Sequence, residues 1–536
     1  MIELTARTSL SLSRARMRVQ EVHVFWAAVT AIACALAGVL GWLLGRWPPH
    51  EDETLALFVG RRSFGDAMHT VIAERGGAPL HFAIAWAVVH LGGGLTALRV
   101  VSLVFAAASV PLIGLLGARL ADRGVGFAAA LLAAGSWGML FQGIYGRMYS
   151  LFLVTSLLSF LALLTALDRG GWRRFALWGL ALLLVLASHP YAALVFAAQA
   201  LFVILRRTRL RAALTTLAVV AVAGIPFWWA DLVLRDRFDV GLGGGGRRLG
   251  SPASVLHYLW WVAGDFSAGH HAWSAPVLLL ALAGALLLAR RRRGGVLLTA
   301  SVVVVPALTF MVATLHSTVS PEARHLIFAL PFFSILLAVP LVAVGRVRPP
   351  ITGVVAVVAV GVLLVGEVRW AHRKTPPLFD GDPHGEVRAR DSAAAWLAST
   401  ARPDDVLLGY EPLYLLAWER NRSFSNHVLP RADPSLFANA LKDIPEPIGR
   451  GVWVLDASDT TNVTERQSIP FVLPRPRRAF EGRAFGPYLV IRSRAPLGTR
   501  SSYLDAATKV MRLGRTLGIG DADVNLGTIR QARSRL

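Results

Sequence analysis

Two adjacent carboxylates, Asp52 and Glu53, follow directly after the first hydrophobic segment of the chain, Val22 to Trp47. Carboxylates at the mouth of a membrane-spanning segment are costly to desolvate, and such residues are usually retained for a function. A carboxylate in that position could take a proton from a hydroxyl group. The alternative is that both acids belong to a solvated loop. Which other residues lie on the same side of the membrane distinguishes a catalytic role from a solvated loop.

Cationic, imidazole and phenol groups recur later in the chain, at the ends of apolar runs. These residues are His81, Arg147, Tyr149, His189, Tyr191, Arg324 and His325. An arginine can hold a phosphate through paired hydrogen bonds and stabilise the charge on it. Together with a proton-accepting carboxylate, this set suits group transfer from a phosphate-bearing donor to a hydroxyl. The structural alternatives are an arginine that reaches to lipid headgroups, a histidine that ends a helix, and an ion pair between Arg324 and Glu322.

The composition predicts a polytopic α-helical membrane protein. Of the 536 residues 54% are hydrophobic and 16% are charged, whereas soluble proteins carry about a quarter charged residues. The net charge of +22 comes mostly from arginines in short clusters between apolar runs. Such clusters are typical of topology determinants that meet membrane lipids, and they argue against a nucleic-acid partner. We therefore expect a multi-pass protein of the plasma membrane.

The apolar runs must position the polar residues. Val22 to Trp47 is too long for a signal peptide, so we interpret it as an uncleaved first helix behind a cytoplasmic tail, residues 1–21. The first extracytoplasmic loop, residues 48–78, is amphipathic and predicts one or two helices along the outer face. Further apolar runs follow up to Trp370, and with the first they predict about 11 to 13 spans.

The basic clusters predict the sides of the membrane. Arg290 to Arg293 and similar clusters belong in the cytoplasm, which leaves Asp52 and the other polar candidates outside. Strict alternation fails once, and we expect the short run from Pro79 to Gly92 not to span fully. The glycine-rich stretch Gly241 to Gly250 is followed by no Lys-Ser/Thr pair, so we interpret it as a flexible outer loop, not as a phosphate-binding loop.

Charged residues and turn signals return after Trp370 and predict a C-terminal extracytoplasmic α/β domain, residues 371–536, behind a transmembrane catalytic domain, residues 22–370. The predicted helices are Asp391 to Thr400, Ser435 to Leu441 and Tyr503 to Leu513. The predicted strands are Asp405 to Tyr410, Val452 to Asp456 and Tyr488 to Arg492.

Several short motifs occur in a characteristic order. After the first helix and Asp52-Glu53 come Ala-Pro-Leu-His at Ala78 to His81, Gly-Arg-Met-Tyr-Ser-Leu at Gly146 to Leu151, Ser-His-Pro-Tyr at Ser188 to Tyr191 and Glu-Ala-Arg-His at Glu322 to His325. This order resembles the polyprenyl-phosphate-dependent glycosyltransferases of the GT-C architecture, family 39-like, which are related to the protein O-mannosyltransferases and to the lipid A aminoarabinose transferase. The resemblance covers roughly Val22 to Trp370, and His325 stands where many members have tyrosine.

The resemblance implies a GT-C-like fold and a function. A sugar would pass, with inversion, from a polyprenyl-phosphate donor to a glycan, lipid or protein acceptor on the extracytoplasmic face. Asp52 would be the base and Glu53 its partner near the substrate hydroxyls, while Arg147, and by its charge Arg324, would hold the donor phosphate. The substrate-binding residues would be Tyr149, His189, Tyr191, His81 and His325. No cofactor is required on this interpretation, although a divalent cation held by the first-loop acids stays open.

A lipid or solute transporter is the alternative function, because it too would show a dozen helices with polar groups between them. It should also show broken helices in paired positions of an internal repeat, and the sequence shows no such repeat. A scaffold or sensor would leave Asp52 and Arg147 unexplained. A transferase predicts that Asp52, Arg147 and Arg324 converge, whereas a transporter predicts a site at the membrane midplane.

Overall fold

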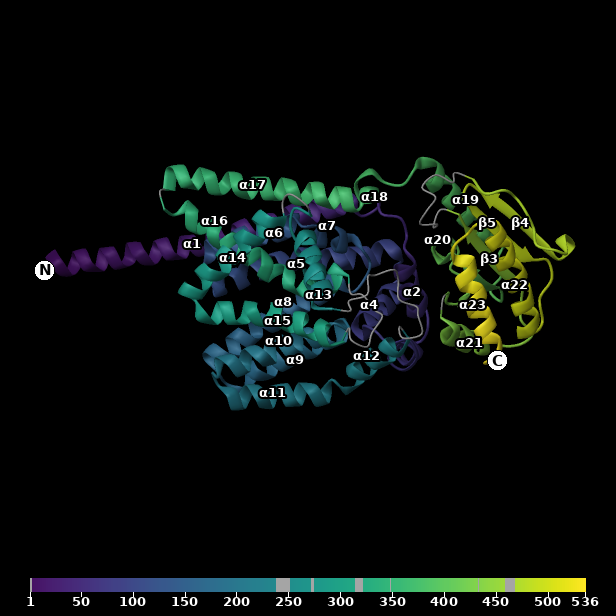
Figure 1. Ribbon diagram of the computed structural model, residues 1–536, viewed down its shortest axis with the longest axis horizontal. Helices are drawn as coiled ribbons and strands as arrows, with labels where there is room; N and C mark the ends of the chain where they lie inside the picture. The colour runs from purple at the N-terminus through teal and green to yellow at the C-terminus, as the bar shows by residue number, and fades with distance from the viewer. Residues whose placement is uncertain are drawn as a thin grey trace.

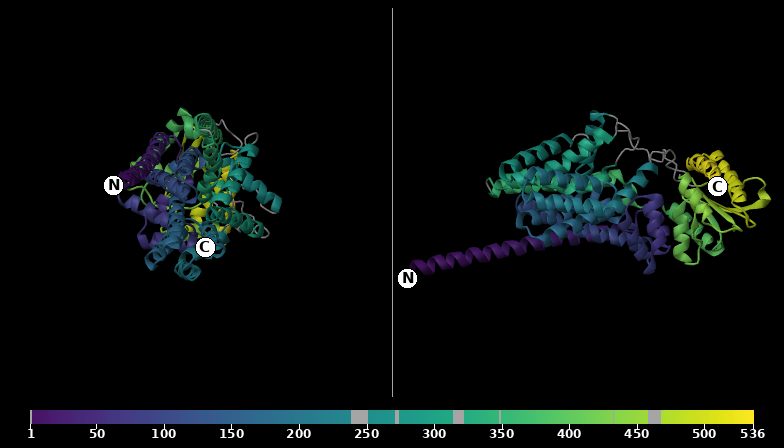
Figure 2. Two further views of the ribbon diagram at one scale, coloured as in Figure 1. Left: turned by 90° about the vertical axis from the view of Figure 1, so that its left-hand side faces the viewer. Right: turned by 90° about the horizontal axis from the view of Figure 1, so that it is seen from below.

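The computed structural model shows a bundle of helices followed by a mixed α/β region at one end of the bundle (Figures 1 and 2). It describes residues 2–237, 251–270, 274–313, 322–347, 349–431, 433–457 and 468–536. The glycine-rich stretch 241–250 lies outside the described residues.

Seven helices in the described part of the chain are long and apolar enough to cross a membrane. They are α1 (Ile2–Leu43, with its apolar part at Gln20–Leu43), α5 (Leu95–Leu120), α8 (Tyr149–Arg169), α14 (Ser274–Arg291), α15 (Arg293–Ala313), η4 (Ala323–Ala329) joined to α16 (Leu330–Gly345), and α17 (Pro349–Lys374). The chain is therefore a polytopic helical membrane protein.

Two bent helix pairs raise the number of spans to nine if each pair is one span. The pairs are α6 (Arg123–Gly135) with α7 (Trp137–Ile144), bent by 59°, and α11 (Leu210–Ala223) with α12 (Ile225–Arg237), bent by 58°. The sequence predicts more spans because several apolar runs form shorter helices. These are α4 (Pro79–His90), α9 (Trp172–Ser188), α10 (Ala192–Arg206) and α13 (Pro252–Asp265). The 12 residues of α4 extend only about 18 Å, so this run is too short to span, as predicted.

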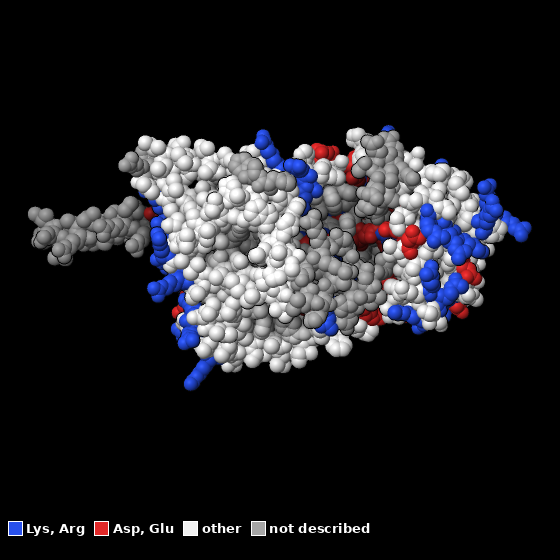
Figure 3. All heavy atoms as spheres, in the orientation of Figure 1, with Lys and Arg blue, Asp and Glu red and all other residues white. Residues whose placement is uncertain are grey.

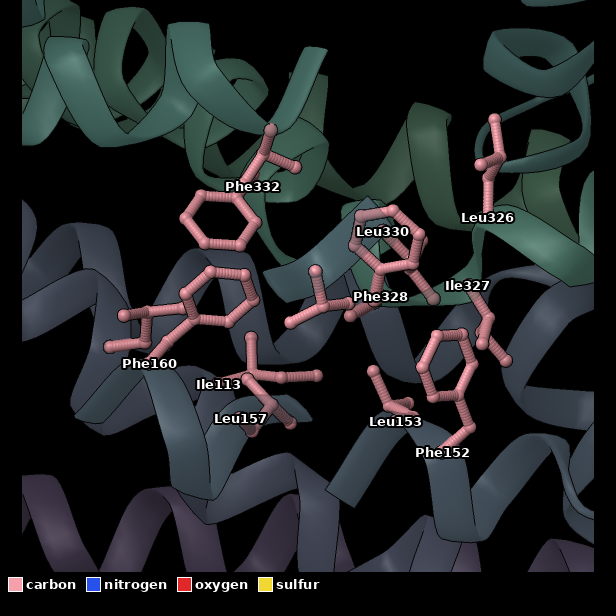
Figure 4. Packing of buried hydrophobic residues seen from close by; sticks show 14 of the residues in the cluster. Ile113, Phe152, Leu153, Leu157, Phe160, Leu326, Ile327, Phe328, Leu330 and Phe332 are labelled. Carbon is pink, nitrogen blue, oxygen red and sulfur yellow. The ribbon is translucent and has the colours of Figure 1, made fainter. Parts of the chain in front are cut away.

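Aromatic packing in the bundle core aligns the beginning of α8 with the beginning of the η4–α16 segment. Phe152 and Phe160 of α8 pack edge-on against Phe328 and Phe332, with ring centroids 5.6 and 4.9 Å apart. Figure 4 shows these rings interleaved with aliphatic side chains between α8 and the η4–α16 segment. This packing holds the first turn of η4, with Arg324, beside the first turn of α8.

The loop after α1 folds into α2 (Glu51–Gly60), α3 (Phe64–His69) and the π-helical η1 (Thr70–Arg75), which confirms the predicted helices of this interval. His50 caps α2: its Nδ1 accepts the Asp52 N–H at 3.2 Å, and the Glu53 carboxylate accepts the His50 N–H at 3.1 Å. This reciprocal capping box satisfies amides that would otherwise lack partners, and acids in the first turn suit the positive end of the helix dipole.

The C-terminal region contains a five-stranded mixed sheet in the order β2-β1-β3-β5-β4. The strands are β1 (Val406–Gly409), β2 (His427–Val428), β3 (Gly451–Asp456), β4 (Phe480–Phe485) and β5 (Tyr488–Ser493). β1 runs parallel to β2 and β3, whereas β5 is antiparallel to β3 and β4. The predicted strands correspond to β1, β3 and β5.

Helices cover both faces of this sheet. Along β3, Trp453 and Leu455 point to one buried cluster, and Val452 and Val454 to another, because successive strand residues face opposite sides. The first cluster includes α21 (Pro434–Lys442), α22 (Arg500–Thr516) and α23 (Asp521–Arg533); the second includes α19 (His384–Thr400), α20 (Glu411–Arg420), α2 and α4. α19, α21 and α22 were predicted from the sequence, whereas α20 and α23 were not. Short helices α18 (Pro376–Asp380) and η5 (Arg477–Ala479) complete the region.

Candidate active site

An ion pair between Asp52 and Arg147 forms the centre of the candidate site. Asp52 lies in the first turn of α2 and Arg147 in the turn between α7 and α8, 95 residues apart. The Arg147 Nη1 is 3.0 Å from the Asp52 Oδ1, and the side chains are 15% and 34% exposed. The carboxylate therefore meets solvent on one side and a largely buried guanidinium on the other.

Arg324 is the second cation of the site. Its guanidinium lies over the Tyr149 ring, 5.4 Å from the centroid, and pairs with Glu322 at 2.8 Å. The Glu322 pair is the structural alternative raised by the sequence. Arg324 nevertheless also acts on Asp52. Burial alone would raise the pKa of Asp52, but the charges of the neighbouring cations, chiefly Arg147 with a contribution from Arg324, outweigh burial and lower this pKa to about 2. Asp52 is therefore an anion at neutral pH.

Glu53 has a different environment from the one predicted for a group near the substrate hydroxyls. Its side chain is fully buried and forms a paired ion contact with Arg99 of α5, at 2.8 and 2.6 Å. It also accepts the Gly146 N–H at 2.7 Å. With its oxygens occupied in this way, Glu53 holds α2 against the turn that carries Arg147, and we treat it as a positioning residue.

His50 and Tyr145 also contact Asp52, and neither was among the candidate residues. The Tyr145 hydroxyl lies 2.9 Å from the His50 Nδ1 and 3.4 Å from the Asp52 Oδ2. Because this nitrogen also accepts the Asp52 N–H, the Nδ1 is unprotonated, and burial lowers the pKa of His50 despite the neighbouring carboxylates. The capping-box pattern could have identified His50. Nothing in the local sequence marks Tyr145.

The remaining aromatic and imidazole candidates form one cluster at the ends of α8, α9, α10 and the η4–α16 segment. Tyr191 stacks on His325 at 4.7 Å, and Tyr149 lies 5.4 Å from His189 between ring centroids. His189 and His325 lie 5.8 Å apart. Both also have local roles at chain turns, because the His189 Nδ1 accepts the Tyr191 N–H and the His325 Nδ1 accepts the Glu322 N–H.

His81 is the remaining candidate and lies on α4. It is 4% exposed and stands beside Phe82, and its Nε2 has no hydrogen-bond partner among the described residues. The structure thus pairs Asp52 with Arg147 and places the charge of Arg324 near enough to act on Asp52, with Tyr149 between Arg324 and the ring cluster. Convergence of all three on one cavity stays a prediction.

No group of three or more His, Cys, Asp or Glu side chains in the described ranges is arranged to hold a metal ion. The Asp52 and Glu53 carboxylates, which were the open candidates for a cation, are instead engaged by Arg147 and Arg99.

Solved structures of ArnT from Cupriavidus metallidurans have a similar fold. The apo structure matches with a TM-score of 0.54 and 13% identity over 89% of this chain and 98% of ArnT. The structure of ArnT bound to undecaprenyl phosphate matches with a TM-score of 0.55 and 12% identity, over 87% and 97% of the two chains. The chain has a GT-C-like fold. At these identities the likeness shows the fold alone.

A weaker match is to the oligosaccharyltransferase AglB from Archaeoglobus fulgidus, in complex with an inhibitory peptide and a dolichol-phosphate. Its TM-score is 0.48 at 10% identity, over 80% of this chain and 69% of AglB, and we draw nothing from it. No protein-family profile and no curated protein matches the sequence. The GT-C-like fold expected from the order of motifs is thus confirmed.

Proposed function

We propose that this chain is a membrane glycosyltransferase that transfers a sugar from a polyprenyl-phosphate donor to an acceptor hydroxyl on the extracytoplasmic face. The observation that carries the proposal is the Asp52–Arg147 pair, an ionised carboxylate and a mostly buried guanidinium at the ends of spanning helices. A lipid-borne donor and a water-borne acceptor meet at such a boundary. The fold shared with ArnT, which has been crystallised with undecaprenyl phosphate, supports the donor class.

In the proposed reaction Asp52 takes the proton of the acceptor hydroxyl while the hydroxyl oxygen attacks the anomeric carbon. The bond between that carbon and the phosphate oxygen breaks, and the polyprenyl phosphate leaves with the bonding electrons. Direct displacement inverts the anomeric centre. Arg147 and Arg324 stabilise the charge that develops on the leaving phosphate, as fixed cations do in a water-poor site.

The low pKa of Asp52 gives the donor a second role. A carboxylate with a pKa of about 2 is ionised at neutral pH but is a weak base. A donor phosphate bound by Arg147 and Arg324 competes for the guanidinium that now holds Asp52. Asp52 then becomes more basic when the donor is in place, which ties proton removal to a loaded site.

The other candidate residues take supporting roles in this proposal. The ring cluster of Tyr149, His189, Tyr191 and His325 contacts the sugar or the phosphate, and His81 of α4 adds a further contact. The reaction needs no cofactor. A divalent cation is the alternative way to hold the phosphate, and loss of transfer on chelation would favour it.

The test is transfer of radiolabelled sugar from a panel of polyprenyl-phosphate donors, in membranes that contain the wild type or Asp52→Asn. General-base catalysis contributes about 10²- to 10⁴-fold, so the variant should lose transfer by roughly that factor at equal expression. Asp66→Asn is the matched control, because Asp66 is an exposed acid of the same loop. Equal transfer by the wild type and Asp52→Asn would remove Asp52 as the base. Absence of transfer from every donor, with native membranes supplying acceptors, would count against a transferase.

A transporter is the second candidate function, and the two bent helix pairs favour it, because broken spans are common at transport sites. However, Asp52, Arg147 and Arg324 lie at the ends of spans and not halfway along them. Movement of a labelled lipid across reconstituted vesicles without sugar transfer would support the transporter.

A further inference from the structure

A cleft of about 270 Å³ opens between the first-loop helices and the C-terminal region, and Asp52 lies on its wall. α2 and η1 form one side, and α20, α21 and α23 contribute to the other. In Figure 3 acidic side chains gather at this junction of the bundle and the C-terminal region. A molecule in the cleft would touch the proposed base directly.

Most of the charged groups that line the cleft are hydrogen-bond acceptors, and apolar side chains form much of the remaining lining. Its charged members are the carboxylates of Glu51, Asp52, Glu74, Glu411, Asp433, Asp443 and Asp521 and the guanidinium groups of Arg62, Arg75 and Arg431. Carboxylates accept hydrogen bonds and cannot donate them when ionised. The excess of carboxylates over guanidinium groups also repels phosphate and carboxylate groups on a ligand.

Asn525 adds an observation that points to a ligand. This residue of α23 lines the cleft and is 4% exposed. Its Oδ1 is buried, with no donor in the part of the chain that the structure describes. A buried amide oxygen without a partner costs stability, so this position is suited to a ligand that donates a hydrogen bond.

Arg431 makes the lining a mixture of donors and acceptors. Its side chain is 10% exposed and forms ion pairs with Glu51 of α2, with Glu411 of α20 at 3.0 Å, and with Asp521 of α23. A hydroxyl group both donates and accepts, so it can bridge neighbouring carboxylate and guanidinium groups. A phosphate oxygen mainly accepts hydrogen bonds and is repelled by the excess of carboxylates, whereas an ammonium group can pair with the carboxylates but offers the guanidinium groups no acceptor.

We infer that the cleft is the acceptor site and that the acceptor is an uncharged, hydroxyl-rich glycan. The inference rests on the proposed function, because it takes the molecule beside Asp52 to be the sugar acceptor. It narrows the acceptor from glycan, lipid or protein to one chemical class. Asn525 would accept a hydrogen bond from a glycan hydroxyl that does not itself react.

The test measures binding without any donor. The full chain in lipid nanodiscs is dialysed to equilibrium against labelled short oligosaccharides of three kinds: neutral hexose oligomers, uronic acid oligomers and glucosamine oligomers. The neutral oligomers should bind, and the uronic acid oligomers should bind at least about tenfold more weakly because of charge repulsion. Asn525→Leu should weaken neutral binding by about fivefold to tenfold. Asn439→Leu, on the exposed side of α21, is the matched control and should leave it unchanged.

Tighter binding of the uronic acid or glucosamine oligomers, no neutral binding, or equal effects of the two asparagine variants would each overturn the inference. Failure of the proposed function has a different signature. If neutral oligomers bind as expected and neither they nor other acceptors receive sugar from any donor, the cleft is a glycan site in a protein that is not a transferase. Sugar transfer that depends on Asp52 but prefers anionic acceptors would support the glycosyltransferase function and contradict the inference of an uncharged glycan acceptor.

Discussion

Asp52 and Glu53 are neighbours in the chain with opposite surroundings. Consecutive helix residues point about 100° apart, so Asp52 faces Arg147 and the cleft, whereas Glu53 faces the interior and Arg99. The partly exposed acid can meet a substrate hydroxyl. The buried acid, Glu53, fixes the position of α2 and therefore of the Asp52 carboxylate.

The charge of Asp52 should make stability depend on pH in a definite direction. Its pKa in the folded protein is lowered to about 2, against about 3.9 in an unfolded chain. The ionised carboxylate therefore stabilises the fold fully above about pH 4, and this contribution is lost as the pH falls toward 2. The difference in thermal midpoint between the wild type and Asp52→Asn, measured in detergent, should be constant near neutrality and shrink in that acid window. A difference that grows with acidity would contradict the predicted sign.

At the scale of elements, α2 is held at its first turn by three other segments. His50 caps it, Glu53 binds Arg99 of α5 and the Gly146 amide, and Arg99 also donates to the Trp47 and Pro48 carbonyls beyond α1 at 2.7 and 2.8 Å. One buried ion pair thus joins the end of α1, α5, the α7–α8 turn and α2. The distance between Asp52 and Arg147 depends on that junction.

Removal of one partner of this pair should be costly. Glu53→Gln leaves the Arg99 charge buried and unpaired, which typically destabilises a protein by about 3–5 kcal/mol. Unfolding in a mild-detergent and denaturant titration should show a loss of that size. Asp391→Asn, in an exposed pair with Arg420 at 3.1 Å, should cost less than about 1 kcal/mol. Similar small losses in both variants would show that Glu53 does not hold the junction.

At the scale of the whole molecule, the C-terminal region shares a hydrophobic cluster with the loop after α1. Leu57 and Phe58 of α2 lie in the same buried cluster as Leu413 and Trp418 of α20. Arg61 adds hydrogen bonds across the junction to the Phe424 and Ser425 carbonyls, at 2.7 and 3.1 Å. The acidic cleft beside Asp52 exists only because these two parts pack together.

The shared cluster predicts that α2 and α20 lose protection together. Leu57 is 0% exposed, and a carboxylate there would be buried without a partner. Leu57→Asp should therefore speed amide hydrogen exchange in both Glu51–Gly60 and Glu411–Arg420. Phe471→Asp, at a residue that is 57% exposed, should change neither segment. Faster exchange confined to α2 would mean that the two parts are stabilised independently.

The sequence alone determined the membrane character, most of the apolar helices, the helices after α1 and the central strands β1, β3 and β5. Hydropathy and periodicity are local properties, so they can be read from neighbouring residues. The candidate residues Asp52, Arg147 and Arg324 were also identified, from residue type, from position at the ends of apolar runs and from the resemblance in motif order.

Only the tertiary structure decided which partners each candidate residue contacts and therefore which role each can have. It assigned Glu53 to Arg99, added His50 and Tyr145 to the surroundings of Asp52, shortened runs such as α4 below a full span, and placed α23 beside α2 to form the cleft. Each of these features depends on side chains from segments far apart in the chain. Hydropathy and spacing describe one segment at a time, so contacts between distant segments are fixed only when the bundle and the C-terminal region pack together.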